Sequence, residues 1–208
     1  MGQRLVIHCE KGGEEIANCY YHWSGYSDSS VERVQQVIHS LEKFASETDP
    51  ALRCVKAFQD YDESFFHIID NAAPEKMTAI LVEKDLEEAK KRWPDQVFRA
   101  QGNRNTGLIS ITKETMAEST KWEEAAAHIN LDDETFYIDA FWFEDEDSYQ
   151  DYWQAEENMD FETYVQQDRV YDFDASDIYS WKQIDEYADI VFGHEEFYTG
   201  EYLVTKIQ

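Results

Sequence analysis

An imidazole flanked by aromatic rings is the clearest candidate for a binding site in the sequence. Residues 22–26 read His-Trp-Ser-Gly-Tyr and follow a strand-like run. A polar ring beside aromatic rings, at a junction between a strand and a helix, can bind a small molecule. Arg4 and Arg104 could complete such a pocket by holding an anionic group. A small-molecule-binding or catalytic site at this loop is therefore one alternative for the function, and its candidate residues are Arg4, His22, Trp23, Tyr26 and Arg104.

Two other interpretations of these residues stay open. Tyr and Trp rings often serve packing alone, with a single hydrogen-bond partner for the polar atom. The two arginines can instead pair with carboxylates of the chain itself, which are abundant.

The other residues with catalytic or metal-binding potential follow no established pattern. The sequence has no CxxC or HxH pair, and His194-Glu195-Glu196 lacks the second histidine of a zinc-protease helix. Residues 172–177 begin like a calcium loop, but Asp177 stands where the sixth position needs glycine and Gln183 where the twelfth needs glutamate. No phosphate-binding glycine loop, GxSxG elbow or Rossmann fingerprint occurs. We therefore predict no metal, no cofactor and no enzymatic activity.

The number of cysteines and the lack of long apolar runs indicate the cellular compartment. Cys9, Cys19 and Cys54 are odd in number and unpaired in spacing, which favours a reducing environment over a secreted disulfide scaffold. Cys19 and His22 lie three residues apart in a predicted strand, so they point to opposite faces and form no nucleophile-base pair. Nowhere do about 18 apolar residues run together, and the N-terminus lacks the pattern of a signal peptide. We predict a cytoplasmic protein without a membrane span.

Acidic and aromatic side chains are concentrated together in the last third of the chain. Residues 131–208 hold 23 acidic and three basic side chains, and 19 of the 31 aromatic residues, whereas residues 1–130 hold 22 acidic and 15 basic side chains. Such acidity is typical of disorder, but aromatic rings bury large apolar areas and can support a fold. We therefore predict an α+β module over 1–130 and a folded acidic part over 131–208, packed together as one domain.

This charge distribution excludes some partners and favours others. Nucleic acids and anionic membranes are bound through Lys and Arg, so neither is an expected partner. A basic protein is the better candidate, because a folded acidic surface attracts cationic clefts at long range. The carboxylates predicted to bind that protein lie on or beside a helix expected over 145–158, or further along the chain: Glu144, Asp145, Glu146, Asp147, Asp151, Glu156, Glu157, Asp160, Glu162, Asp172, Asp174 and Asp177.

Rows of carboxylates at this density could imitate the charge of duplex DNA, which is one negative charge per roughly 1.7 Å of axis. Asp147 and Asp151 would share one helical face about 6 Å apart. A second group could extend the row: Asp168, Asp172, Asp174, Asp177, Asp185, Glu186 and Asp189. The alternative is that the acidity serves solubility alone.

Apolar periodicity and turn residues predict a mixed α+β fold of antiparallel hairpins and several helices. Strand-like runs over 4–10 and 15–23 flank a turn at 11–13. The other elements are expected in this order: helices over 29–44 and 50–58, a strand over 65–69, a helix over 81–93, a strand over 107–111, a helix over 113–122, a hairpin of 128–131 with 136–143, helices over 145–158 and 176–190, and a strand over 202–207.

Two segments carry a resemblance to known proteins. Gly2-Gln3-Arg4 and the run Tyr20-Tyr21-His22-Trp23-Ser24-Gly25-Tyr26, with a helix after it, resemble the opening of small uncharacterised proteins of Gram-positive bacteria and their phages. The run 103–109 looks like a second shared element. The resemblance covers about the first two-thirds of the chain and implies an origin in a phage or mobile element.

Many such elements encode acidic DNA mimics that inhibit restriction enzymes or CRISPR nucleases. By this analogy of charge and origin, the expected partner is a basic nucleic-acid-binding protein such as a defence nuclease. The oligomeric state is left open by the sequence.

Overall fold

A mixed β-sheet forms the centre of the protein. The computed structural model describes residues 4–22, 24–25, 27–70, 79–96, 98–100, 107–139, 171–172, 178–192 and 198–199. Eight strands pair in the order β4-β3-β5-β2-β1-β6-β7-β9. Their bounds are β1 Leu5–Lys11, β2 Glu14–Tyr21, β3 Ala79–Leu81, β4 Phe98–Ala100, β5 Leu108–Ser110, β6 Ala125–Asn130, β7 Thr135–Asp139 and β9 Tyr179–Ser180. The α+β prediction is confirmed.

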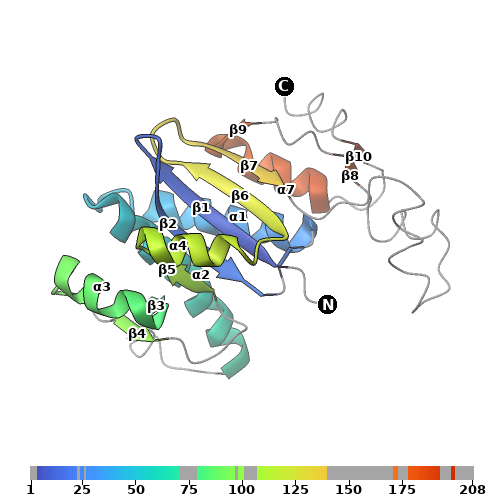
Figure 1. Ribbon diagram of the computed structural model, residues 1–208. Coiled ribbons are helices and arrows are strands. Elements are labelled where there is room, and N and C mark those ends of the chain that lie inside the picture. Colours follow the sequence, from blue (N-terminus) through green and yellow to red (C-terminus); the bar gives the residue numbers. More distant parts are fainter. Residues whose placement is uncertain are drawn as a thin grey trace.

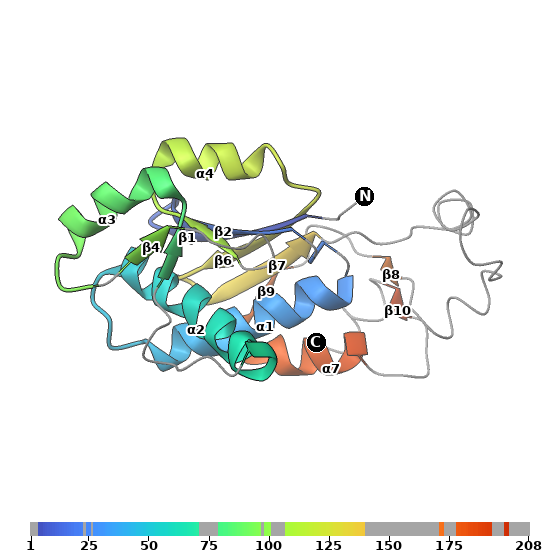
Figure 2. The same cartoon turned by 90° about the horizontal axis from the view of Figure 1, so that it is seen from below.

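Helices lie on both faces of this sheet. They are α1 Ser27–Lys43, α2 Pro50–Asp70, α3 Leu86–Arg92, α4 Lys113–Thr120 and α7 Ile184–Phe192, with 3₁₀ turns η2 Glu83–Asp85 and η3 Trp181–Gln183. Helices α1, α2 and α7 lie on one face, and α4 crosses the other face over β2 and β5 (Figures 1 and 2). Strands β8 Tyr171–Asp172 and β10 Tyr198–Thr199 form a separate parallel pair.

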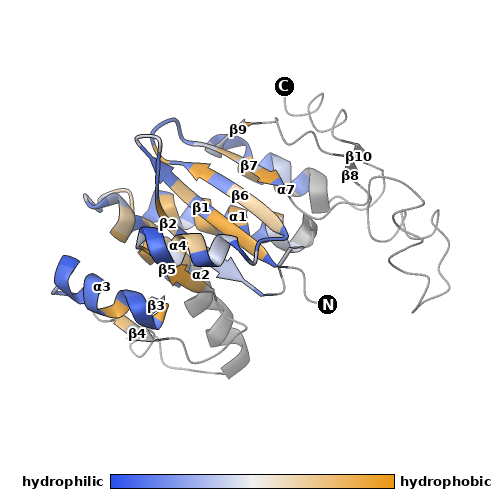
Figure 3. Cartoon of the chain, viewed as in Figure 1, coloured by the Kyte–Doolittle hydropathy of each residue, from blue (hydrophilic) through white to orange (hydrophobic). Residues whose placement is uncertain are grey.

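The main core lies between the sheet and helices α1, α2 and α7. Side chains alternate along β1, so Leu5, Ile7 and Cys9 belong to this core, and helix α1 contributes five buried residues at helical spacing: Val31, Val34, Val37, Ile38 and Leu41. Figure 3 shows hydrophobic residues along β1, β6 and β7, whereas α3 is mostly hydrophilic. The core also includes residues of β7 and α7, which follow residue 130 in the chain. The predicted division into parts 1–130 and 131–208 stays a prediction.

A turn and a helix start predicted from the sequence are confirmed. The β1–β2 hairpin turns at Gly12 and Gly13, whose φ angles of 63° and 73° lie in the left-handed region that glycine tolerates. Helix α2 begins at Pro50, and Asp49 Oδ1 accepts hydrogen bonds from the backbone N–H groups of Ala51 and Leu52. Asp49 therefore acts as the N-cap.

Three segments differ from the prediction. The strand expected over 65–69 is wrong, because α2 continues to Asp70; no Gly or Pro stops the helix after Phe58. The helix expected from Leu81 begins only at Leu86, since Leu81 is a buried residue of β3. The helix expected from 176 begins at Ile184, after β9 and η3. The elements expected over 145–158 and 202–207 lie outside the described residues.

Gly107 lies where there is no space for a side chain. A Cβ atom there would come within 2.4 Å of Cys19 Sγ and 2.8 Å of Tyr21 Cε1, and both residues are buried. We expect Gly107→Ala to lower the free energy of unfolding by about 1–3 kcal/mol, as overpacked cores do. Urea denaturation of Gly107→Ala, Cys19→Ala and the double variant measures this loss. Additive losses in the double variant would contradict a clash with Cys19.

Candidate functional site

A pocket of about 630 Å³ lies between helix α4 and the sheet. We call it the Tyr20–Trp122 pocket. It is lined by residues from five parts of the chain: Arg4, Tyr20, His22, Val82, Glu83, Lys84, Leu108, Thr115, Glu118, Ser119 and Trp122. Its volume falls within the range of about 300–1,000 Å³ that is common for small-molecule sites.

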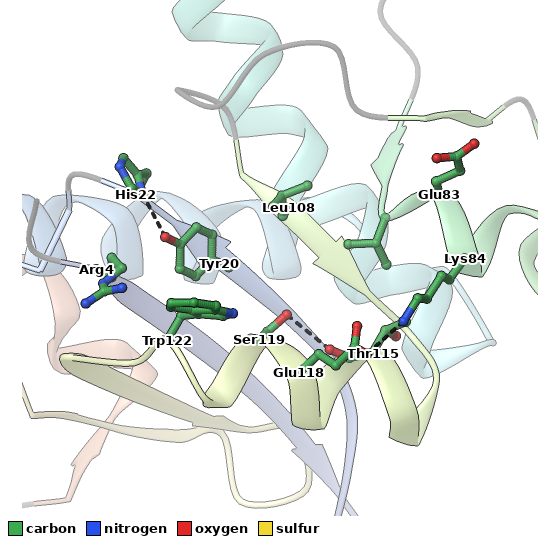
Figure 4. Close-up of a pocket in the computed structure, with 11 residues that line it drawn as sticks. Arg4, Tyr20, His22, Glu83, Lys84, Leu108, Thr115, Glu118, Ser119 and Trp122 are labelled. Atoms are coloured by element: carbon green, nitrogen blue, oxygen red, sulfur yellow. Dashed lines mark hydrogen bonds and ion pairs between the residues drawn. The ribbon is translucent and has the colours of Figure 1, made fainter.

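Aromatic rings form the middle of this pocket. The Tyr20 hydroxyl and His22 Nδ1 are 2.8 Å apart, and Trp122 lies below the Tyr20 ring (Figure 4). Trp122 follows the C-terminus of α4 and is 60% exposed, which is unusual for so large an apolar ring. The pocket therefore presents an indole surface that the described residues leave largely uncovered.

Arg4 forms one end of the pocket and is fixed by Glu124. Its guanidinium Nη2 donates to the Glu124 carboxylate, and its backbone N–H donates to Glu124 Oε2 at 3.0 Å. Its carbonyl accepts from the N–H groups of Glu124 and Ala125. The hydrogen bond from Arg4 lowers the pKa of Glu124 and in turn raises the pKa of Arg4. The Arg4 guanidinium carbon lies 5.6 Å from the centre of the Trp122 ring.

Arg4 retains hydrogen-bonding capacity beyond this ion pair. Its Nε atom is buried and has no partner among the described residues. A guanidinium carries five N–H donors, and buried donors are normally satisfied.

Lys84 lies at the opposite end, where it donates to Glu118 of α4 at 2.7 Å. A buried carboxylate joins the two walls at this end. Asp85 accepts hydrogen bonds from the Ile111 N–H at 2.7 Å, the Thr112 hydroxyl at 2.9 Å and the Thr115 hydroxyl at 2.7 Å. Turn η2 and the first turn of α4 are thereby held together.

The structure brings together two of the five residues predicted for a pocket. Arg4 and His22 both line it, whereas Trp23, Tyr26 and Arg104 lie outside the described residues. The pairing of Arg4 with a carboxylate of the chain is also present. Cys19 belongs to the main core and so lies apart from His22.

The predicted acidic face falls almost wholly outside the described residues. Of its twelve residues, the structure describes only the backbone of Asp172, as part of β8. In the second acidic group, Asp185, Glu186 and Asp189 lie on the exposed side of α7, and Asp185 Oδ1 lies 2.8 Å from Nε2 of His39.

A row of three stacked rings crosses the sheet on the face that carries α4. His8, His128 and Tyr137 are direct register partners on β1, β6 and β7. The centres of the two imidazole rings are 4.6 Å apart, and those of His128 and Tyr137 are 4.5 Å apart. Carboxylates surround this ring row: Glu15 and Glu123 lie 2.6 Å from the two nitrogens of His8, and Glu10 lies 2.9 Å from Nδ1 of His128.

His8 is a buried cation in this row. Burial lowers its pKa, but hydrogen bonds to Glu123 and Glu15 and the charges of both carboxylates outweigh burial and raise the pKa to about 9. For Glu15, burial raises the pKa, but hydrogen bonds from His8 and Asn18 bring it below its usual value. His8 therefore carries a positive charge at neutral pH although it is only 5% exposed.

This shift predicts a loss of stability in mild alkali. Because the folded pKa of about 9 exceeds the unfolded value of 6.5, the stabilisation is complete below pH 6.5 and disappears as pH rises through 9. The difference in unfolding free energy between the native chain and His8→Gln should shrink by about 3 kcal/mol over this window. Urea denaturation at several pH values measures it. A difference independent of pH would show that His8 is not an imidazolium in the fold.

The cysteine side chains of the described residues lie in the hydrophobic core. Cys9, Cys19 and Cys54 are buried and form no disulfide with one another, and burial raises the pKa of Cys9. Within the residues that the structure describes, no cluster of three or more His, Cys, Asp or Glu side chains is arranged to hold a metal ion. Among the described helices, none has the length and apolar character needed to cross a bilayer.

Comparisons with protein-family models, curated proteins and solved structures found no match for this chain. The resemblance to small phage and bacterial proteins therefore stays a prediction.

Proposed function

We propose that the protein binds a small molecule in the Tyr20–Trp122 pocket. The observation that carries this proposal is the convergence of an exposed indole, the Tyr20–His22 pair and Arg4 at one cavity of about 630 Å³. An apolar pocket with a few polar groups directed at one place is the usual form of a ligand site.

The lining residues favour a particular class of ligand. The open surface of Trp122 suits a planar or apolar ring, since aromatic stacking stabilises such contacts by about 1 kcal/mol. The cationic guanidinium of Arg4 suits a ligand that brings a hydrogen-bond acceptor. We therefore propose a compact ligand that joins an aromatic ring to a carboxylate, sulfonate, phosphate or carbonyl group.

A fluorescence titration tests this proposal. The probe is 8-anilinonaphthalene-1-sulfonate (ANS), which combines aromatic rings with a sulfonate, used at physiological ionic strength to limit repulsion by the acidic chain. We expect saturable binding of one probe per chain. Leu108→Arg, which places a long side chain in the pocket, should abolish it without changing the circular dichroism spectrum. Binding that never saturates, or that survives Leu108→Arg, would contradict the proposal.

A second candidate function is the binding of a basic protein by the acidic part of the chain. The observation that favours it is the 23 acidic and three basic side chains of residues 131–208. A cytoplasmic nucleic-acid-binding protein of a host defence system, of restriction or CRISPR type, is the proposed partner, and imitation of DNA is the proposed mode of inhibition.

Affinity capture from a host lysate tests this second function. The lysate is treated with nuclease, and capture is compared at low and high salt. We expect a basic protein that is released as salt rises and that competes with DNA. Neutralising Glu144–Asp147 and Asp151 should abolish capture, whereas Arg4→Ala with His22→Ala should leave it unchanged. A partner insensitive to both salt and DNA would rule out mimicry.

A further inference from the structure

The short connection between α4 and β6 carries the pocket's exposed tryptophan and two anchoring carboxylates. We call residues 122–124 the pocket strap. Glu124 is bound to Arg4, as described above. Glu123, directly after Trp122, lies with its Oε2 atom 2.6 Å from Nε2 of His8 in β1. Two neighbouring residues of the strap are therefore held by the N-terminal strand and the residue before it.

Each ring nitrogen of His8 faces a carboxylate. Both nitrogens must carry a proton if each is to donate a hydrogen bond to its ionised carboxylate. Ionised carboxylates only accept hydrogen bonds, and a neutral imidazole donates through one nitrogen alone. When His8 loses a proton, either Glu15 or Glu123 must lose its donor. Glu15 keeps the Asn18 amide at 2.9 Å, whereas among the described residues the Glu123 carboxylate accepts a hydrogen bond from His8 alone. Glu123 is therefore the partner that is released.

The groups that face His8 come from three elements, and the two carboxylates among them raise its pKa. Glu15 belongs to β2, Glu123 to the pocket strap and His128 to β6, where it stacks on His8. Glu10, from β1 itself, lies behind His128 and binds its Nδ1 atom. Two carboxylates and one stacked imidazole thus face the buried His8 ring, and a third carboxylate binds the stacked imidazole.

We propose that His8 is a positioning residue for the Tyr20–Trp122 pocket: its protonated ring holds Glu123, and Glu123 holds Trp122 against the ligand. This inference rests on the proposed ligand-binding function. Loss of the proton frees Glu123 and lets the strap and the Trp122 ring move, which weakens ligand binding although His8 itself does not line the pocket. Ligand affinity should therefore depend on pH through a residue outside the site.

Fluorine NMR of the full chain labelled with 5-fluorotryptophan tests this positioning without a ligand. The Trp122 resonance is assigned with Trp122→Phe. In the native chain, we expect it to shift between pH 6.5 and above pH 9, with a midpoint near the pKa of about 9. In His8→Gln the shift should be absent. Glu123→Gln should also abolish the shift, and it serves as the test if His8→Gln folds poorly. His39→Gln, which changes an exposed histidine on α1, should leave it intact.

Titration with ANS over the same pH range then separates this inference from the proposed function. We expect affinity for ANS to fall roughly fivefold or more from pH 6.5 to above pH 9 in the native chain, and to be weak at every pH in His8→Gln. A Trp122 resonance that titrates through His8 while ANS never binds would support the positioning role and overturn the pocket function. ANS binding that neither pH nor His8→Gln changes, with an unshifted Trp122 resonance, would overturn the positioning role.

Discussion

Replacing Asp85 by alanine should lower the free energy of unfolding by about 3 kcal/mol, the largest loss that we expect from a single side chain near the pocket. Asp85 is fully buried and accepts from the Ile111 N–H group and from the Thr112 and Thr115 hydroxyls. Without the carboxylate, these three donors, two of them buried, lose their shared acceptor. Urea denaturation measures the loss.

Two controls distinguish this network from a general effect of charge. Asp95→Ala makes the same chemical change at an exposed position and should alter stability by less than about 0.5 kcal/mol. Asp85→Asn keeps one carbonyl oxygen as acceptor and turns an amide toward a donor, so we expect an intermediate loss. If Asp85→Ala were as stable as Asp95→Ala, the network would not hold η2 against α4.

Trp122→Ala should weaken the binding of ANS about tenfold, or roughly 1.4 kcal/mol, while the stability of the fold hardly changes. The indole is 60% exposed, so its removal leaves no buried cavity, but it takes away the ring on which a ligand would stack. Fluorescence titration gives the affinity and thermal unfolding gives the stability.

Ile178→Ala is the matched control for this substitution. Ile178 is another large apolar side chain, 65% exposed, and is not among the residues that line the pocket. It should leave ANS affinity unchanged. Equal losses in Trp122→Ala and Ile178→Ala would indicate nonspecific adsorption of the probe to exposed apolar surface.

The local elements of this fold were predictable where a short-range physical rule decides them. The glycine turn at 12–13, the proline start of α2 and the apolar stripe of α1 each follow from backbone geometry or helical spacing. The true start of η3 also had a local signal, because Ser180 and Gln183 form a capping box. The three-residue strands β3 and β4 lack any such signal, since segments this short show no periodicity.

The site could be predicted only in part, because its residues meet through long-range pairing. Arg4 and His22 stood out by residue type. Trp122, Leu108 and Lys84 did not, because nothing local indicates that α4 crosses β2 and β5. The ring row depends on the parallel pairing of β1 with β6, which places His8 opposite His128 across 120 residues of sequence separation.

Fluorine NMR with ring-bearing acids as ligands tests the central claim most directly. The chain has six tryptophans, and labelling with 5-fluorotryptophan gives each its own resonance. Addition of ANS or another aromatic acid should shift the Trp122 resonance in a saturable manner. A ligand that binds but leaves the Trp122 resonance unmoved while shifting that of another tryptophan would show that the Tyr20–Trp122 pocket is not the binding site.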